Sequence, residues 1–209
     1  MQVAELEALL RAADTELIPS LAIGAFAGLR NQEIWGLDWS NIKLKRARPI
    51  IELPIGVSKT GSRRPVYIQP NLAEWLTPYA KESGSVMPLA QRSGLPSTKK
   101  YERLKAEAKV RAKVEMPDNC LRNSFASYFV ALCDDEAHCA EQMGTSVTML
   151  RKHYRELADP ADAPAYFEIA PNPEAPISEF TVPVMETRRW TDHNYSIMNP
   201  NVYDPVSAV

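Results

Sequence analysis

The sequence predicts a mainly α-helical domain with one small antiparallel β-sheet or hairpin, an α+β fold. Two observations lead to this class. Apolar residues recur at helical spacing over most of the chain up to residue 170, with glycine and proline between the periodic segments. The stretch 49–68 instead has β-branched runs on both sides of Lys-Thr-Gly-Ser, which is typical of a hairpin. At 209 residues, 45% of them hydrophobic, the chain can bury one core and carry an appendage.

The helices are predicted in order from spacing and from their boundary residues. The second has Pro19 near its start, and Gly28 interrupts the pattern after it. Asp118 or Asn119 is the expected N-cap of the helix that carries Arg122, and Gly144 is the expected C′ residue of the helix that follows it. The predicted helices cover 3–13, 16–27, 31–37, 71–82, 97–113, 116–133, 135–143, a segment that Ser146 caps, and 160–169.

From about residue 171 onward, prolines break any periodicity, so 171–209 is expected to be an extended or partly disordered tail. The net charge of −2 conceals an asymmetry. Residues 156–209 contain nine acidic and two basic residues, a net −7, which leaves +5 on residues 1–155. A basic body with an acidic tail indicates that the body binds a polyanion.

Several classes of protein are disfavoured. No apolar run approaches the roughly 18 to 20 residues that span a bilayer, and the N-terminus lacks a signal-peptide layout, so a cytoplasmic protein is expected. The three cysteines form no zinc-type pattern, which indicates reduced thiols and no metal site. No phosphate-binding glycine loop or His-Glu-x-x-His motif is present.

Two arginines occupy positions at which helices begin. Arg30 lies between an apolar helix and a short amphipathic one, where it either points into a cleft or pairs with Glu33 at i+3. Arg122 lies in the first turn of its helix, where a cation opposes the helix dipole. That placement indicates an anion held beside the helix N-terminus, and an exposed arginine is the alternative.

The hairpin and the last basic helix supply two more candidates. Lys59 is at the predicted hairpin tip, where it is either solvated or delivers an ammonium to a backbone phosphate. Pro54 cannot donate to a ladder, so its strand is predicted to be an edge or irregular strand. Tyr154 shares one helix face with Val147 and Leu150 and therefore points inward, as either a core aromatic or a nucleophile.

Together these residues form an ordered set of motifs: Gly-Leu-Arg-x-x-Glu-Ile at 28–34, the hairpin Lys59, Leu-Arg-x-x-Phe-Ala at 121–126, and Met-Gly-x-Ser at 143–146 followed by Tyr154. The chain over residues 1–170 resembles the catalytic domain of the tyrosine recombinase (phage integrase) family. The resemblance implies that family's fold and DNA strand exchange through a covalent 3′-phosphotyrosyl intermediate, without metal or nucleotide cofactor.

Roles follow from the resemblance, position by position. Arg30 and Arg122 would clamp the scissile phosphate, with Glu33 supporting the helix of Arg30. Lys59 would protonate the 5′-hydroxyl leaving group, and Tyr154 would be the nucleophile. Two positions depart from the family pattern: Asn119 replaces the usual histidine three residues before Arg122, and Thr145 replaces the histidine or tryptophan after the glycine. Asparagine can donate a hydrogen bond to phosphate but cannot accept the phenol proton.

The function expected from the sequence is therefore that of a site-specific DNA recombinase or integrase catalytic domain. Its catalytic set is Arg30, Lys59, Asn119, Arg122, Thr145 and Tyr154. The expected partner is double-stranded DNA, with self-association on DNA and location at the nucleoid, and the tail 171–209 is expected to dock on a neighbouring subunit. The family's N-terminal core-binding domain is expected to be absent. The alternative is a catalytically impaired DNA-binding or assembly module with the same fold.

Overall fold

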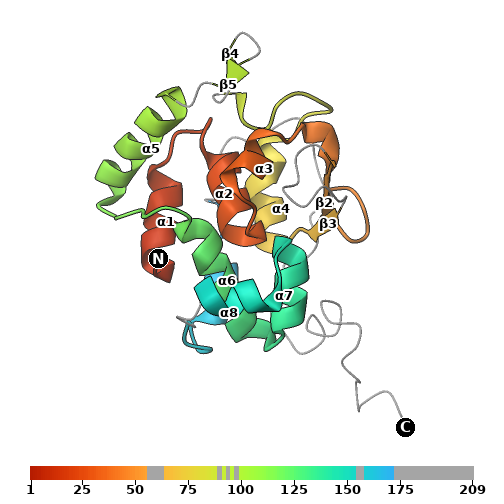
Figure 1. Ribbon diagram of the computed structural model, residues 1–209. Coiled ribbons are helices and arrows are strands. Elements are labelled where there is room, and N and C mark those ends of the chain that lie inside the picture. The colour runs from red at the N-terminus through yellow and green to blue at the C-terminus, as the bar shows by residue number, and fades with distance from the viewer. Residues whose placement is uncertain (56–63, 89–90, 93–94, 97–98, 154–157, 172–209) are drawn as a thin grey trace.

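The computed structural model describes residues 1–55, 64–88, 91–92, 95–96, 99–153 and 158–171 (Figure 1). Within them the protein is a cluster of helices with a small antiparallel sheet on one side, which confirms the predicted fold class. The tail 171–209 lies outside this description apart from Pro171. No helix in the described ranges is both long and apolar enough to cross a bilayer.

Helix α2 (Ile18–Ala27) is the centre of the core. Its sequence, IPSLAIGAFA, is apolar on every face, and all ten of its residues are buried. A helix without a polar face must be covered all round. The covering elements include α4 (Pro70–Leu76), α6 (Cys120–Cys133) and α3 (Asn31–Trp35), all of which contact α2. Pro19 occupies the first turn of α2 and Gly28 ends the helix, both as predicted, and Gly28 is in the left-handed region.

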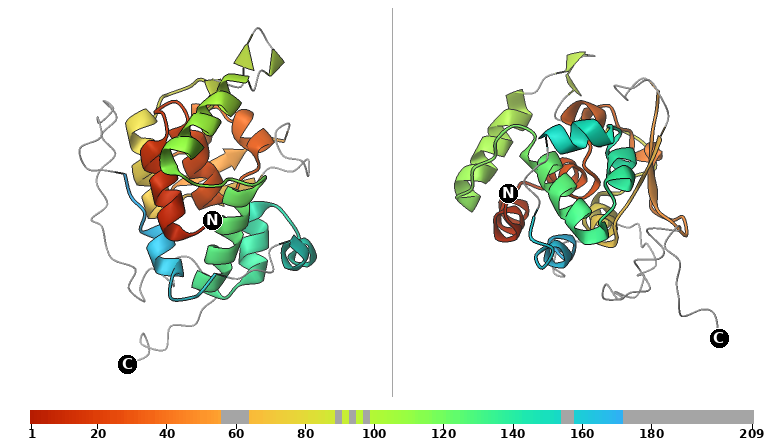
Figure 2. Two further views of the ribbon diagram at one scale, coloured as in Figure 1. Left: turned by 90° about the vertical axis from the view of Figure 1, so that its left-hand side faces the viewer. Right: turned by 60° about the horizontal axis from the view of Figure 1, so that its bottom comes forward.

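Two further helices lie on the side away from the sheet. In Figures 1 and 2, α5 (Lys99–Ala112) runs beside α1 (Val3–Ala12), and the two helices are in contact. Tyr101, Leu104 and Ala108 are the buried stripe of α5, while most of its lysines and arginines are exposed. The helix is therefore amphipathic, with its basic face exposed to solvent.

The sheet order is β1-β2-β3, from β1 (Ile42–Lys43), β2 (Ile50–Leu53) and β3 (Arg64–Tyr67). β2 and β3 are antiparallel with Ile51 opposite Val66, which confirms that two paired strands flank the Lys-Thr-Gly-Ser segment. β2 is the middle strand, so the prediction of an edge strand was wrong. Pro54 follows the last paired residue, Leu53, and therefore withholds no ladder hydrogen bond. A second pairing, β4 (Gln91–Arg92) with β5 (Leu95–Pro96), was not anticipated.

The remaining helices close the core and carry the site. α7 (Glu136–Met143) and α8 (Val147–His153) follow α6, and α9 (Ala163–Phe167) packs against α6. Tyr166 of α9 stacks on Tyr128 of α6, with ring centroids 4.1 Å apart, and its hydroxyl donates to the Ala25 carbonyl at 2.9 Å. These contacts bring the end of the helical region back onto α2. The predicted helix over 71–82 ends earlier, at Leu76, and continues only as a 3₁₀ turn, Thr77–Tyr79.

Candidate active site

Arg30 is positioned by the sharp end of α2. Gly28 has φ +64°, and a Cβ there would come within 2.4 Å of the Phe125 ring, so both conformation and space require glycine. The chain then turns into α3 with Arg30 as its N-cap. The Arg30 amide donates to Glu33 Oε2 at 2.9 Å, and its guanidinium lies 3.4 Å from Glu33 Oε1. The predicted i+3 pair with Glu33 therefore forms, and the side chain remains 30% exposed.

Arg122 is buried, which overturns the alternative of an exposed arginine. It is the third residue of α6 and only 4% exposed. Its guanidinium donates one hydrogen bond to the carbonyl of Gly28 and another, of 3.1 Å, to the carbonyl of Met143. These carbonyls compensate the unfavourable position of a cation in the first turn of a helix.

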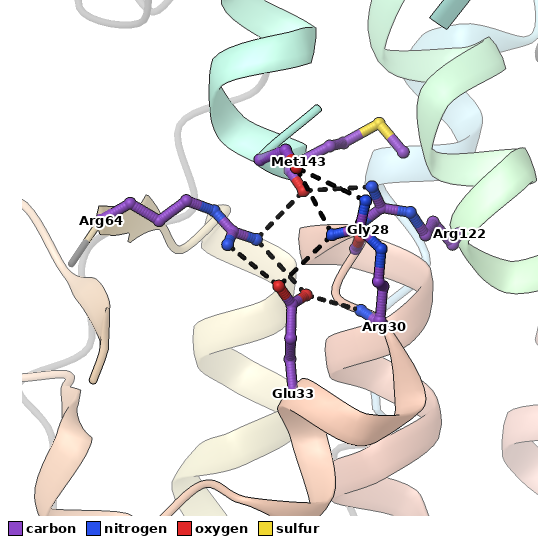
Figure 3. Close-up of polar contacts among 7 residues, drawn as sticks. Gly28, Arg30, Glu33, Arg64, Arg122 and Met143 are labelled. Atoms are coloured by element: carbon purple, nitrogen blue, oxygen red, sulfur yellow. Dashed lines mark hydrogen bonds and ion pairs between the residues drawn. The ribbon is translucent and has the colours of Figure 1, made fainter. Parts of the chain in front are cut away.

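The C-terminus of α7 is the point at which the arginines meet (Figure 3). Gly144 ends α7 in the left-handed region, with φ +63°, as predicted. The carbonyls of Met143 and Gly144 lie past the last helical hydrogen bonds and can accept bonds from side chains. Both terminal nitrogens of Arg30 lie 3.4 Å from the Gly144 carbonyl oxygen, and Arg122 contacts Met143. The predicted phosphate-clamping arginines thus converge on one turn.

A third arginine, Arg64, joins them and was missed in the sequence. It is the first residue of β3, with a side chain only 10% exposed. Its Nη1 lies 3.1 Å from Glu33 Oε1, its Nη2 lies 3.4 Å from Glu33 Oε2, and Nη2 also donates to the Met143 carbonyl at 3.1 Å. The only signal in the sequence was a pair of arginines opening the second β-branched run, which does not distinguish a surface cation from a buried one.

Glu33 is the counter-ion of this cluster. It is 1% exposed and interacts with both Arg30 and Arg64. The three guanidiniums and one carboxylate of Arg30, Arg64, Arg122 and Glu33 have a formal charge of +2. Burial lowers the pKa of Arg64 from its usual value, Glu33 opposes that shift, and Arg122 and Arg30 add to it. Positive charge in a partly desolvated site favours an anion.

Asn119 and Thr145 are on the turns that flank the cluster. Asn119 is the N-cap residue of α6, exposed and in the left-handed region with φ +60°, and its side chain makes no capping bond. Thr145 is half-buried, and its amide closes the turn after α7 by donating to the Ala140 carbonyl at 2.9 Å. Asn119 thus directly precedes α6, which contains Arg122, and Thr145 follows the end of α7, whose Met143 carbonyl accepts from Arg64 and Arg122.

Lys59 and Tyr154 lie outside the described residues. The structure does describe their flanking elements: β2 and β3 on either side of 56–63, and α8, whose last residue is His153. Ser146 Oγ accepts from the Met149 amide at 3.2 Å, which confirms the predicted cap of α8, and Leu150 is 3% exposed. No cluster of three or more metal-ligating side chains occurs among the described residues.

No family model and no curated protein sequence matches the chain. Solved structures do. XerA recombinase matches with a TM-score of 0.58 and 21% identity, over 80% of this chain and 64% of that one. XerH site-specific recombinase bound to palindromic difH substrate, in a post-cleavage complex, matches with a TM-score of 0.54 and 18% identity, over 74% of this chain and 49% of that one.

The catalytic domain of bacteriophage HP1 integrase matches with a TM-score of 0.54 and 21% identity, over 73% of this chain and 84% of that one. The protein therefore has the tyrosine-recombinase catalytic-domain fold, as the sequence motifs predicted. Its chain spans about half the length of the XerH chain and 64% of the XerA chain.

Proposed function

We propose that this protein breaks and rejoins DNA as a tyrosine-type site-specific recombinase or integrase, with residues 1–170 as its catalytic domain. The single observation that carries the proposal is the convergence of Arg30 and Arg122 on the carbonyls that end α7. Two planar guanidiniums that converge in a site with excess positive charge suit the two non-bridging oxygens of a phosphodiester.

The chemistry is a transesterification. The Tyr154 phenolate attacks the scissile phosphorus, so that a Tyr154 Oη–P bond forms and the bond to the 5′-oxygen breaks. Lys59 gives a proton to the departing 5′-oxygen, and the reverse reaction with a new 5′-hydroxyl rejoins the strand. Arg30 and Arg122 neutralise the non-bridging oxygens as charge accumulates in the pentavalent transition state. Neither a metal ion nor a nucleotide takes part in these steps.

Asn119 and Thr145 are proposed as contacts to the same phosphate. An asparagine amide and a threonine hydroxyl can each donate a hydrogen bond to an oxygen, but neither removes the phenol proton at neutral pH. General-base help contributes roughly 10²–10⁴-fold to such reactions. Cleavage is therefore expected to be slow below the ordinary phenol pKa of about 10 and to accelerate as the pH rises toward it.

Double-stranded DNA is the proposed partner, held partly by the exposed basic face of α5. The proposal includes self-association on DNA and a role of the tail 171–209 in contacts between subunits. The XerH structures contain difH DNA, which supports a DNA partner for this fold. The second candidate, a DNA-binding or assembly module with impaired cleavage, is favoured by one observation, the exposed Asn119 in place of a base.

A covalent-trapping experiment tests the proposal. The protein is incubated with a library of nicked duplexes whose central sequence is randomised, the mixture is denatured, and protein-linked DNA is recovered and sequenced. Wild-type protein is expected to enrich a common sequence through an adduct that Tyr154→Phe abolishes. Non-covalent enrichment that weakens steeply with salt, without any denaturant-resistant adduct, would favour the assembly module instead.

A further inference from the structure

Arg64 connects the contacts of the other two arginines. It shares the Glu33 carboxylate with Arg30, and both are within 3.4 Å of Glu33 Oε1. It shares the Met143 carbonyl with Arg122, and each donates to that oxygen at 3.1 Å. Figure 3 shows these side chains arriving from β3, α3 and α6 around the end of α7. Arg64 therefore touches the acceptors of both proposed clamp residues.

The Arg64 side chain is largely buried although Arg64 is the first residue of a short strand. A charged side chain at the start of a strand normally extends into water, because burying a guanidinium is unfavourable unless it is paired. Here the side chain is only 10% exposed, and its Nε has no hydrogen-bond partner in the described part of the chain. Arg64 therefore makes its contacts with the Glu33 carboxylate and the Met143 carbonyl even though its buried Nε–H has no acceptor among the described residues, which is unfavourable.

A second contact docks the same strand on the same helix. The Gln142 side chain accepts from the Tyr67 amide at 3.0 Å and donates to the Tyr67 carbonyl at 2.7 Å. The side-chain amide of Gln142 thus pairs with the backbone of β3 in the way that a neighbouring strand would. Gln142 is 2% exposed, so this pairing is shielded from water. Together with Arg64, it holds both ends of β3 against the last turn of α7.

We infer that Arg64 is a positioning residue for phosphate binding: it holds Glu33 and the Met143 carbonyl in place, and these two acceptors orient the guanidiniums of Arg30 and Arg122. The inference rests on the proposed function. In this assignment Arg64 does not contact the phosphate, and its terminal nitrogens keep their contacts with the Glu33 carboxylate and the Met143 carbonyl. Its charge completes the excess of two positive charges that a phosphodiester and an attacking phenolate together balance.

The first test is independent of DNA. The Nε–Hε resonances of Arg30 and Arg122 are recorded by ¹⁵N NMR in wild type, Arg64→Met and Arg11→Met. Arg11 pairs with Glu7 on the exposed face of α1, so its loss removes an arginine of no relevance to the cluster. Arg64→Met is expected to shift or broaden the resonances of Arg30 and Arg122, whereas Arg11→Met leaves them unchanged. Unaltered Arg30 and Arg122 resonances in folded Arg64→Met would overturn the assignment.

The second test uses the duplex recovered by covalent trapping and its analogue with a methylphosphonate at the scissile position. The methyl group removes the negative charge that the clamp neutralises. On the phosphodiester, Arg64→Met is expected to slow adduct formation by about 10²-fold or more, because displaced guanidiniums of Arg30 and Arg122 would weaken the clamp by as much as the loss of one stabilising donor. On the methylphosphonate, the same variant is expected to fall within about threefold of wild type, because no anion requires clamping.

The outcomes separate the two proposals. No adduct with wild-type protein on either duplex would overturn the proposed function, and the NMR result still decides whether Arg64 positions its neighbours. An adduct that Arg64→Met forms as fast as wild type, or an equal defect on both duplexes, would overturn the role of Arg64. If Arg64→Met does not fold, Arg64→Lys replaces it: a single ammonium reaches one acceptor, so a defect of about tenfold is expected on the phosphodiester alone.

Discussion

The guanidinium of Arg64 lies against Gly144, so closely that a Cβ on that glycine would come within 2.5 Å of Arg64 Cζ. Gly144 also has φ +63°, a conformation that other residues adopt only with strain. The glycine of the Met-Gly-x-Ser motif is thus required for two reasons, one local to the turn and one imposed by a strand distant in sequence. Gly84 provides a comparison, because it has φ +104° but a Cβ added there would meet no atom within 4 Å.

Replacing these two glycines by alanine separates the two reasons. Gly84→Ala is expected to lower the free energy of unfolding by about 1–2 kcal/mol, the cost of backbone strain alone. Gly144→Ala is expected to lower it by about 2 kcal/mol more, because the Arg64 guanidinium must leave its charged hydrogen bonds. Urea unfolding followed by circular dichroism measures both. Equal losses would show that the Arg64 contact contributes nothing.

Glu33→Gln tests the counter-ion of the cluster. The substitution preserves the shape of the side chain but removes the carboxylate that pairs with Arg30 and Arg64, so we expect a loss of about 3–5 kcal/mol in unfolding free energy at neutral pH. Glu52→Gln is the matched control, since Glu52 pairs with Arg46 at 2.9 Å where both side chains are about half exposed. Loss of that exposed pair is expected to cost about 0–1 kcal/mol. A Glu33→Gln protein as stable as the control would refute a stabilising role.

Asn119→His is expected to gain activity, if the protein cleaves DNA as proposed. Asn119 is exposed at the start of α6, and histidine tolerates the left-handed region better than most residues. A histidine there would supply the missing base, so adduct formation near pH 7 should accelerate by about tenfold or more. Asp118→His, one residue earlier, controls for added imidazole. The rates are measured on the duplex recovered by covalent trapping, and a gain with Asp118→His alone would contradict the assignment.

Tyr101 predicts how stability changes at high pH. Burial raises the pKa of this phenol to about 12, with further contributions from Glu102 and Cys120 that its contact with Ser20 opposes. In the unfolded chain the phenol ionises near pH 10, so above that pH the unfolded state has lost a proton that the folded state retains. The free energy of unfolding should therefore be highest below pH 10, as far as Tyr101 contributes to it, and should fall by about 2 kcal/mol as the pH rises from 10 to 12.

This prediction is tested by measuring the free energy of unfolding against pH between 10 and 12 in wild type and in Tyr101→Phe. The phenylalanine variant cannot ionise, so its slope should be shallower in that interval, although its stability near pH 7 is lower because the contact with Ser20 is lost. Burial also raises the pKa of Tyr79, Tyr128 and Tyr166, and these phenols contribute to the slope that remains in the variant. Parallel curves for the two proteins would contradict the role of Tyr101.

Local chemistry explains what the sequence alone determined. The apolar α2, the helix ends at Gly28 and Gly144, and the Ser146 cap each depend on residues within one or two turns, so periodicity and capping preferences predicted them. The motif order then predicted the catalytic-domain fold and the two arginines that converge on α7. The prediction of an edge strand from Pro54 was wrong because the effect of a proline depends on where the strand ends, and the sequence did not specify that position.

Only the tertiary structure decided which cations are buried and which carbonyls receive them. Arg64 looks in sequence like any arginine at the start of an element, and its difference from the exposed Arg46 arises from its packing partners. For Arg122 the sequence left open whether the side chain is buried or exposed, and only the fold shows that it is buried. The order of the three strands, and the pairing of Gln142 with Tyr67, are likewise contacts between distant segments. A buried charge is tolerated only when counter-ions or hydrogen-bond acceptors contact it. For these arginines the acceptors come from several elements, and only the folded chain brings them together.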